Sequence, residues 1–359
     1  MSSAPRVQLI STQKLKFIRP ARCLRVKPTH RDVLWIIKCW SPPSDYTAPR
    51  EEMVFEFIKT VSLFSQSDMV PILGPSVRAA RSISIRIDSL PTKLAVALVL
   101  AGPTDLGAFI RGFVWLELHL LTFEIKNQIT GLEEDRLSKP NRPIVAGRIS
   151  VGAAQDLYWV IALVSTVFSA QFGLLPCTVL YLAAIFCYNE LAMSRNWFCK
   201  SFLGSIGYVC YCWGTTVMFD HGAPLSTLST TAIVLSGLLH TTTGHAQDFR
   251  DRDGDAAIGR VTLPMILSPR VGRWSLALLL AAWTAALIWL WAPPALVTLY
   301  LGLLGLKAAA GFIQDHSVEA DRVSYWWYNI WLITAHLLPA FAHVGVWNVV
   351  DPVSFLPLR

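Results

Sequence analysis

Long apolar stretches recur along most of the chain, and short polar segments separate them. A helix needs about 20 apolar residues to cross the roughly 30 Å hydrocarbon core of a bilayer. The pattern predicts eight such helices, and we expect them at residues 107–126, 157–175, 177–193, 202–219, 228–245, 274–291, 295–313 and 327–343.

One more crossing is expected upstream, between Met53 and Leu100. Pro71, Pro75 and a basic, Ser-rich insert at residues 78–93 interrupt this stretch, so the pattern does not fix its limits. The expected fold is an all-α, integral membrane multi-helix bundle with about nine transmembrane helices. The chain divides into three expected parts, which are a basic N-terminal arm at 1–50, a transmembrane catalytic domain at 51–345 and a C-terminal tail at 346–359.

The composition excludes the main alternatives to a membrane protein. Of the 359 residues, 53% are hydrophobic and only 15% are charged, whereas soluble domains have about 25% charged residues. A soluble enzyme and a disordered protein are therefore both disfavoured. The seven cysteines show no regular spacing that predicts a disulfide framework. The net charge of +7 does not predict nucleic-acid binding, because the basic residues gather in particular connections.

The positions of the basic residues predict how the bundle lies in the membrane. Lys and Arg occur in the connections at residues 127–156, 194–201 and 246–273. The alternate connections, at 173–176, 219–226 and 292–294, contain neither. Because short cytoplasmic loops collect Lys and Arg, we expect the basic connections and the N-terminal arm in the cytosol, with the protein in the endoplasmic reticulum membrane. The insert at 78–93 departs from this rule.

Two connections on the basic side also carry acidic residues, at 127–143 and 245–264. Asp248, Asp251 and Asp255 are spaced i, i+3 and i+7, so one face of a helix would present all three carboxylates. Oxygen ligands of this kind favour Mg²⁺, which commonly binds one or two carboxylates together with substrate phosphates. Basic side chains that would contact a diphosphate flank both segments, and these are Lys139, Arg142, Lys200, Arg250 and Arg260.

The simpler interpretation is that each segment is a solvated loop at the membrane surface. One acidic loop would favour that interpretation, but two such loops on one side of the bundle, each beginning at a helix end, favour a diphosphate site. The residue pattern predicts no zinc site, since His119, His240, His245 and His336 lack the spacing of paired ligands.

Both segments resemble the paired aspartate-rich motifs of the UbiA superfamily of membrane prenyltransferases. The second motif, D-x-x-D-x-x-x-D, matches in full at Asp248, Asp251 and Asp255. The first, N-D-x-x-D-x-x-x-D, matches at Asn127 and Asp135 but has Gln128 and Gly131 where the family has Asp. The resemblance implies that catalysis depends on Asn127, Asp135, Asp248, Asp251 and Asp255, and that these five residues and Glu134 hold Mg²⁺.

The altered first motif resembles a fungal branch of this superfamily that includes membrane-bound terpene cyclases. The resemblance covers about residues 51–343, but the insert at 78–93 falls outside it. It implies an enzyme of terpenoid biosynthesis that ionises farnesyl or geranylgeranyl diphosphate with Mg²⁺ and cyclises the cation. An alternative is transfer of the isoprenyl group to an aromatic or other acceptor. A transporter is an alternative of a different class, in which Glu117 and Glu124 would line a path.

The hydrocarbon part of such a substrate would need a dry pocket with aromatic rings, which stabilise a cation by about 0.5–2 kcal/mol each. Candidates lie in or near the apolar stretches, and they are Trp115, Phe123, Tyr188, Tyr208, Trp213, Trp326, Tyr328 and Trp331. Glu117, Glu124 and Asn127 share a helix face, where a carboxylate would remove a proton from the cation or pair with Arg111. The sequence predicts contact with membrane lipid but leaves the oligomeric state open.

Overall fold

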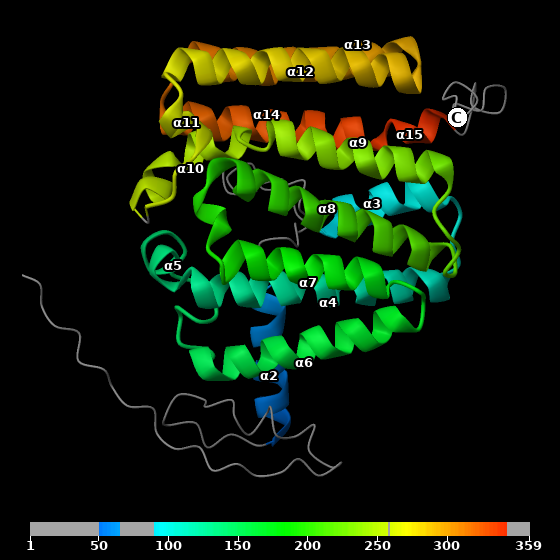
Figure 1. Ribbon diagram of the computed structural model, residues 1–359, viewed down its shortest axis with the longest axis vertical. Helices are drawn as coiled ribbons and strands as arrows, with labels where there is room; N and C mark the ends of the chain where they lie inside the picture. The colour runs from blue at the N-terminus through cyan, green and yellow to red at the C-terminus, as the bar shows by residue number, and fades with distance from the viewer. Residues whose placement is uncertain (1–49, 65–89, 258, 343–359) are drawn as a thin grey trace, which may run out of the picture.

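The computed structural model describes residues 50–64, 90–257 and 259–342. These residues form a bundle of long, roughly parallel and antiparallel helices, which Figure 1 shows stacked in layers. The long helices are α3 (Leu90–Ala101), α4 (Leu106–Thr130), α6 (Val151–Ala170), α7 (Leu175–Asn189), α8 (Trp197–Phe219), α9 (Thr227–Thr243), α12 (Pro269–Trp291), α13 (Ala295–Gln314) and α14 (Val318–Leu337). The predicted all-α class is confirmed.

Within the described part of the chain, five helices are long and apolar enough to cross a membrane. They are α4, α6, α8, α12 and α13. The helix α7 is apolar but shorter, with 15 residues, and α9 has 17. A membrane bundle is therefore confirmed, whereas the number of nine crossings stays a prediction.

Capping side chains start most of the long helices where the apolar stretches begin. Asp105 accepts a hydrogen bond from the backbone N–H of Ala108 at the start of α4, and Ser317 accepts one from Ala320 at the start of α14. The same kind of cap begins α6, α8, α9 and α12. These bonds satisfy backbone donors that have no partner within the helix.

The last long helix differs from its predicted range of 327–343, because α14 begins nine residues earlier and ends at Leu337. Asp321 lies in its first turn, upstream of the apolar stretch, and its carboxylate is fully buried against Arg273 of α12. The pairing removes the cost that an isolated buried charge would carry. Pro339 then starts the short helix α15 (Pro339–Ala342).

Helix α8 joins the two halves of the bundle, since it contributes to both apolar cores. One core packs α4, α6 and α7 against it, and the other packs α3, α9, α12, α13 and α14. The close approach of α8 to α4 depends on Gly214 of α8, where an added Cβ would lie 2.0 Å from the ring of Trp115 on α4. Small residues allow helices to approach in this way in membranes.

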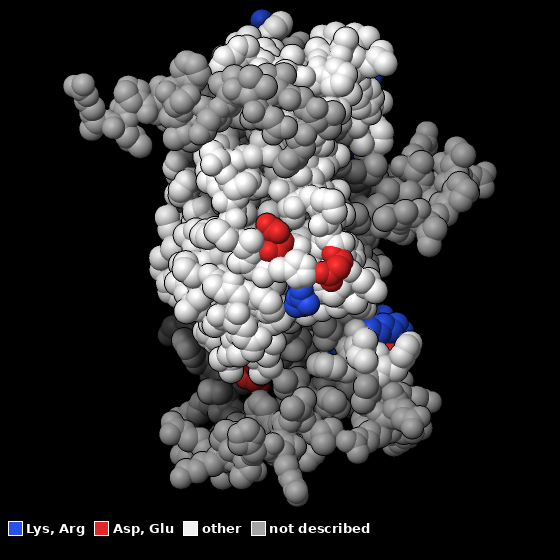
Figure 2. Space-filling model, turned by 90° about the vertical axis from the view of Figure 1, so that its right-hand side faces the viewer, with Lys and Arg blue, Asp and Glu red and all other residues white. Residues whose placement is uncertain are grey.

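The two ends of the bundle differ in charge. The polar helices α5 (Leu132–Ser138) and α10 (Ala246–Ala257) lie at one end, to the left in Figure 1, with the short α11 (Leu263–Ile266) close by. Figure 2 shows the opposite end, where few charged side chains appear among the described residues. The separation agrees with the predicted grouping of the basic connections on one side. Helix α2 (Arg50–Phe64) runs across the others.

Candidate active site

A cavity of about 450 Å³ lies at the charged end of the bundle. The two predicted acidic segments line it together, although more than a hundred residues separate them along the chain. Every predicted site residue lines this cavity except Asp135, so the lining includes Asn127, Glu134, Lys139, Arg142, Lys200, Asp248, Arg250, Asp251, Asp255 and Arg260.

Helix α10 presents its carboxylates to the first turns of α8. Lys200 donates hydrogen bonds to Asp248 Oδ1 at 2.6 Å and to Asp255 Oδ2 at 3.1 Å. Burial raises the pKa of the Asp248 carboxyl, and the positive charge of Lys200 opposes that rise. Asn196 fixes the start of α8 by accepting hydrogen bonds from the Phe198 and Cys199 N–H groups. The Lys200 ammonium group therefore has a defined position between two of the three motif carboxylates.

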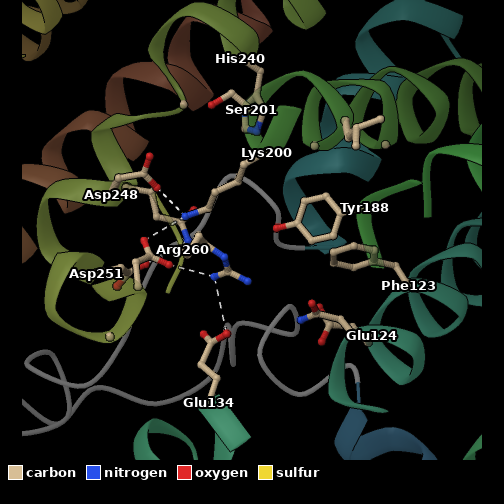
Figure 3. Close-up of a pocket in the computed structure, with 18 of the residues that line it drawn as sticks. Phe123, Glu124, Glu134, Tyr188, Lys200, Ser201, His240, Asp248, Asp251 and Arg260 are labelled. Atoms are coloured by element: carbon tan, nitrogen blue, oxygen red, sulfur yellow. Dashed lines mark hydrogen bonds and ion pairs between the residues drawn. The ribbon is translucent and has the colours of Figure 1, made fainter. Parts of the chain in front are cut away.

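Arg260 connects the two acidic segments across the cavity. Its guanidinium donates to Asp255 Oδ1 at 2.9 Å and lies 3.5 Å from Glu134 Oε2 on α5, as Figure 3 shows for the Glu134 contact. The neighbouring Val261 N–H donates to the Arg195 carbonyl at 3.0 Å, which ties this loop to the start of α8. Each carboxylate that Arg260 touches thus comes from a different segment.

The third motif carboxylate is more open than the other two. Asp251 accepts hydrogen bonds from Gln247 at 3.1 Å and from Arg250 at 3.1 Å, and its side chain is 39% exposed. The Arg250 guanidinium lies 4.1 Å from the centre of the Tyr325 ring. This contact fixes Arg250 in the cavity wall while part of Asp251 stays accessible.

Asp135 lies behind the cavity wall and does not line it. Arg142 donates to both of its carboxylate oxygens, at 2.9 and 2.8 Å. The same guanidinium lies 3.6 Å from Glu124 Oε2, and Glu124 does line the cavity. Burial raises the pKa of the Asp135 carboxyl, and Arg142 opposes the rise. In this arrangement Asp135 holds Arg142 in position beside Asn127.

The donor set of the cavity fits a magnesium ion bound together with a phosphate group. In the described ranges, no three His, Cys, Asp or Glu side chains converge closely enough to hold a metal without other ligands. Lys200 and Arg260 instead lie among the carboxylates. Mg²⁺ needs only one or two carboxylates when waters and phosphate oxygens supply the rest. A diphosphate would meet the cations and share the ion with the carboxylates.

Beyond the charged end, the cavity wall is mostly apolar, although Lys93 and His240 also line the cavity. Its wall there includes Leu120, Phe123, Tyr181, Ile185, Tyr188 and Leu203, together with Gly204 and Gly207 of α8. Phe123 and Tyr188 meet edge to face at 5.8 Å between ring centres, and both face the charged group in Figure 3. Of the other aromatic candidates, Trp115, Tyr208, Tyr328 and Trp331 are buried in the two apolar cores.

The structure adds cavity residues that the sequence did not single out. Lys93 of α3 is almost fully buried, and its ammonium lies 4.3 Å from the centre of the Tyr211 ring. It was assigned to the insert at 78–93, outside the resemblance. Gln247, Asp253 and Arg322 also line the cavity. For Lys93 the available signal was a lysine directly before the apolar run that forms α3.

Comparison with known proteins places the chain in a family. Residues 89–333 match the UbiA prenyltransferase family. A fumagillin beta-trans-bergamotene synthase of Aspergillus fumigatus is 43% identical over 290 residues, which cover 81% of this chain and 94% of that protein. A diterpene cyclase of Hericium erinaceus is 28% identical over 231 residues, covering 60% of this chain and 70% of the relative.

A solved structure shows the same fold at low sequence identity. The UbiA homologue from Archaeoglobus fulgidus, bound to GPP and Mg²⁺, aligns with a TM-score of 0.53 and 12% identity over 80% of this chain and 98% of that one. The family match begins at residue 89 and so includes Lys93, which the predicted range of the resemblance had set aside with the insert. The chain belongs to the UbiA prenyltransferase family.

Proposed function

We propose that this membrane enzyme uses Mg²⁺ to ionise an isoprenyl diphosphate, farnesyl or geranylgeranyl diphosphate, and cyclises the resulting cation to a terpene. The observation that carries the proposal is that one cavity has carboxylates and basic side chains from two distant segments at one end and a mostly apolar wall at the other. Ionisation needs both properties, since negative charge develops on the leaving group and positive charge on the hydrocarbon.

The charged end would hold the headgroup. Lys200, Arg260, Arg142 and Arg250 would donate hydrogen bonds to the diphosphate oxygens, and so would the more exposed Lys139. Asp248, Asp251 and Asp255 would hold Mg²⁺ from α10, and Asn127 and Glu134 would do so from the other segment. Bound Mg²⁺ would neutralise charge on the departing diphosphate. Asp135 belongs to this site through Arg142, which it orients.

The apolar end would receive the isoprenyl chain. Phe123, Tyr181 and Tyr188 present aromatic rings to the cavity, and each ring face would stabilise a cation by about 0.5–2 kcal/mol. The Tyr181 hydroxyl donates to the His119 carbonyl at 2.7 Å, which fixes its ring. Exclusion of water by this wall would favour capture of the cation within its own chain over hydrolysis.

Relatives of both reaction types support the family chemistry and leave transfer to an acceptor as the second candidate. A polyprenyl transferase of Hericium erinaceus is 29% identical over 186 residues, covering 51% of this chain and 63% of that protein. The fumagillin beta-trans-bergamotene synthase is the more similar of these two, at 43%. We therefore favour cyclisation. The transporter alternative is not proposed, because most charged residues of the cavity gather at one end of the bundle, with Lys93 as an exception.

Incubating membranes that contain the protein with farnesyl or geranylgeranyl diphosphate, Mg²⁺ and no acceptor tests the proposal. We expect Mg²⁺-dependent release of diphosphate together with a cyclic hydrocarbon. Asp248→Asn and Asp251→Asn should each lower the rate by at least about 100-fold, as loss of one preorganised electrostatic contact does elsewhere. Asp220→Asn, at the opposite end of the bundle, is the matched control. Turnover only after an acceptor is added would instead support the transferase.

We further propose that the protein lies in the endoplasmic reticulum membrane. In the proposed orientation, the site loops and the N-terminal arm are in the cytosol. The contrast between the two ends of the bundle supports this topology. Single cysteines introduced at exposed Arg136 and at exposed Asp220 should label from opposite sides of sealed vesicles with a membrane-impermeant reagent.

A further inference from the structure

Two glycines follow Lys200 on the cavity face of α8. Gly204 and Gly207 lie four and seven residues after Lys200, so they continue the same helix face one and two turns deeper into the bundle. Both line the cavity. At these two positions α8 presents no side-chain atoms to the cavity, whereas Ser201 and Leu203 of the same helix also line it.

Glycine is a poor residue inside a helix, and several glycines of the long helices show the usual reason for keeping one. At Gly214 an added Cβ would lie 2.0 Å from Trp115, and at Gly237 it would lie 2.7 Å from Val209. Those positions are needed for helix packing. At Gly204 an added Cβ would meet nothing within 4 Å. Gly302 of α13 is equally uncrowded but does not line the cavity, whereas Gly204 does, so the open space at Gly204 is part of the cavity.

We infer that Gly204 is a specificity-determining residue, whose missing side chain leaves the width in which the isoprenyl chain bends back beside its own diphosphate. The inference rests on the proposed function. Cyclisation needs this width, because a distal double bond must reach the allylic end next to Lys200. An extended chain needs less room at that depth. Gly207 borders the same space, with its added Cβ at an ordinary 3.7 Å from the Tyr181 ring.

The products formed from the allylic cation differ between a bent and an extended isoprenyl chain, so they can test the inference. Breaking the C–O bond leaves the electron pair on the diphosphate and an allylic cation on the chain. In a bent chain, a distal double bond attacks the cation, a new carbon–carbon bond forms, and loss of a proton gives a cyclic hydrocarbon. In a chain that does not bend, the cation loses a proton to give a linear alkene, or captures water and loses a proton to give a linear alcohol.

The test compares the wild type with Gly204→Leu, Gly204→Ala and the control Gly302→Leu in detergent, with farnesyl diphosphate, Mg²⁺ and no acceptor. Gly302 lies inside α13, its added Cβ also meets nothing within 4 Å, and it does not line the cavity. Diphosphate release measures ionisation, and gas chromatography with mass spectrometry measures the ratio of cyclic to linear products. Thermal unfolding measures whether each variant folds.

Gly204→Leu should lower the ratio of cyclic to linear products by about fivefold or more, as overfilling a fitted site does, while diphosphate release continues. It should also turn over geranyl diphosphate better relative to farnesyl diphosphate. Gly302→Leu should leave both ratios unchanged. A folded Gly204→Leu variant with wild-type ratios would overturn the inference.

If Gly204→Leu does not fold, Gly204→Ala decides the matter. A smaller shift in the same direction supports the inference, and unchanged ratios overturn it. Absence of diphosphate release from the wild type, or release with linear products alone, would instead refute the proposed function, so the two failures are distinguishable.

Discussion

The ion cluster that anchors the motif helix α10 gives a prediction with a defined magnitude. Asp321 of α14 is fully buried and pairs with Arg273 of α12 at 2.5 and 2.9 Å. Arg252 of α10 lies 3.7 Å from the same carboxylate. The Arg273 guanidinium also lies 4.8 Å from the centre of the Phe249 ring, next to Asp248. Through these contacts, Asp321 connects α12 and α14 to the helix that carries the motif.

Asp321→Asn keeps the shape of the side chain and removes its charge. Arg273 is only 1% exposed, so its positive charge would stay buried without compensation. Breaking a buried pair in this way costs about 3–5 kcal/mol. An unfolding entropy of roughly 2 cal/mol/K per residue corresponds to about 1.3 °C per kcal/mol for the 359-residue chain, so the unfolding temperature in detergent should fall by about 4–7 °C.

The control is Glu133→Gln, because the Glu133–Arg136 pair is also close, at 2.5 Å, but is 79% and 55% exposed. An exposed pair contributes at most about 1 kcal/mol, so this variant should unfold almost as the wild type does. Replacing both buried partners, as Arg273→Met with Asp321→Leu, should cost less than Asp321→Asn alone. An Asp321→Asn variant with the wild-type unfolding temperature would refute the reasoning.

Three further predictions concern packing, the basic group of the site and pH. Gly214→Ala should destabilise the protein by about 1–3 kcal/mol, because its Cβ overlaps the Trp115 ring, whereas Gly204→Ala should not lower the unfolding temperature. Lys200→Met leaves Asp248 and Asp255 without the ammonium group between them, so it should lower the unfolding temperature measured without Mg²⁺. Adding Mg²⁺ should then raise the unfolding temperature of this variant by more than it raises that of the wild type. Burial raises the Asp135 pKa above 3.8, so its contribution to stability is present below that pH and is lost as pH rises through the raised pKa. The unfolding temperature of the wild type relative to Asp135→Asn should therefore decline as the pH rises above 3.8 and through the raised pKa; a constant difference would contradict this.

The sequence predicted the fold well where the membrane imposes the pattern. A spanning helix must satisfy its backbone internally and present apolar side chains, so a long apolar run has few alternative structures. The start of α14 escaped this reasoning, because Asp321 is compensated by Arg273, which is 48 residues distant in sequence. No local pattern shows which charges will be paired in the folded bundle.

The candidate site also has features that the sequence predicted and features that only the folded structure shows. The spacing of Asp248, Asp251 and Asp255 predicted a shared helix face, and α10 provides it. The position of Asp135 behind Arg142 depends on how the loop after α5 folds back, which the motif spacing does not encode. Lys93 was missed because its neighbours upstream are polar and basic, and only the packing of α3 against α8 brings it to the cavity.

The account depends most on one ion and one diphosphate being held together by α10 and by the segment that begins at Asn127. Mn²⁺ in place of Mg²⁺, with the protein in detergent and inorganic diphosphate as the probe, makes this directly observable by electron–nuclear double resonance. We predict a coupling between bound Mn²⁺ and phosphorus in the wild type that is lost in the Asp248→Asn, Asp251→Asn double variant and kept in Asp220→Asn. Equal coupling in all three proteins would contradict the central claim.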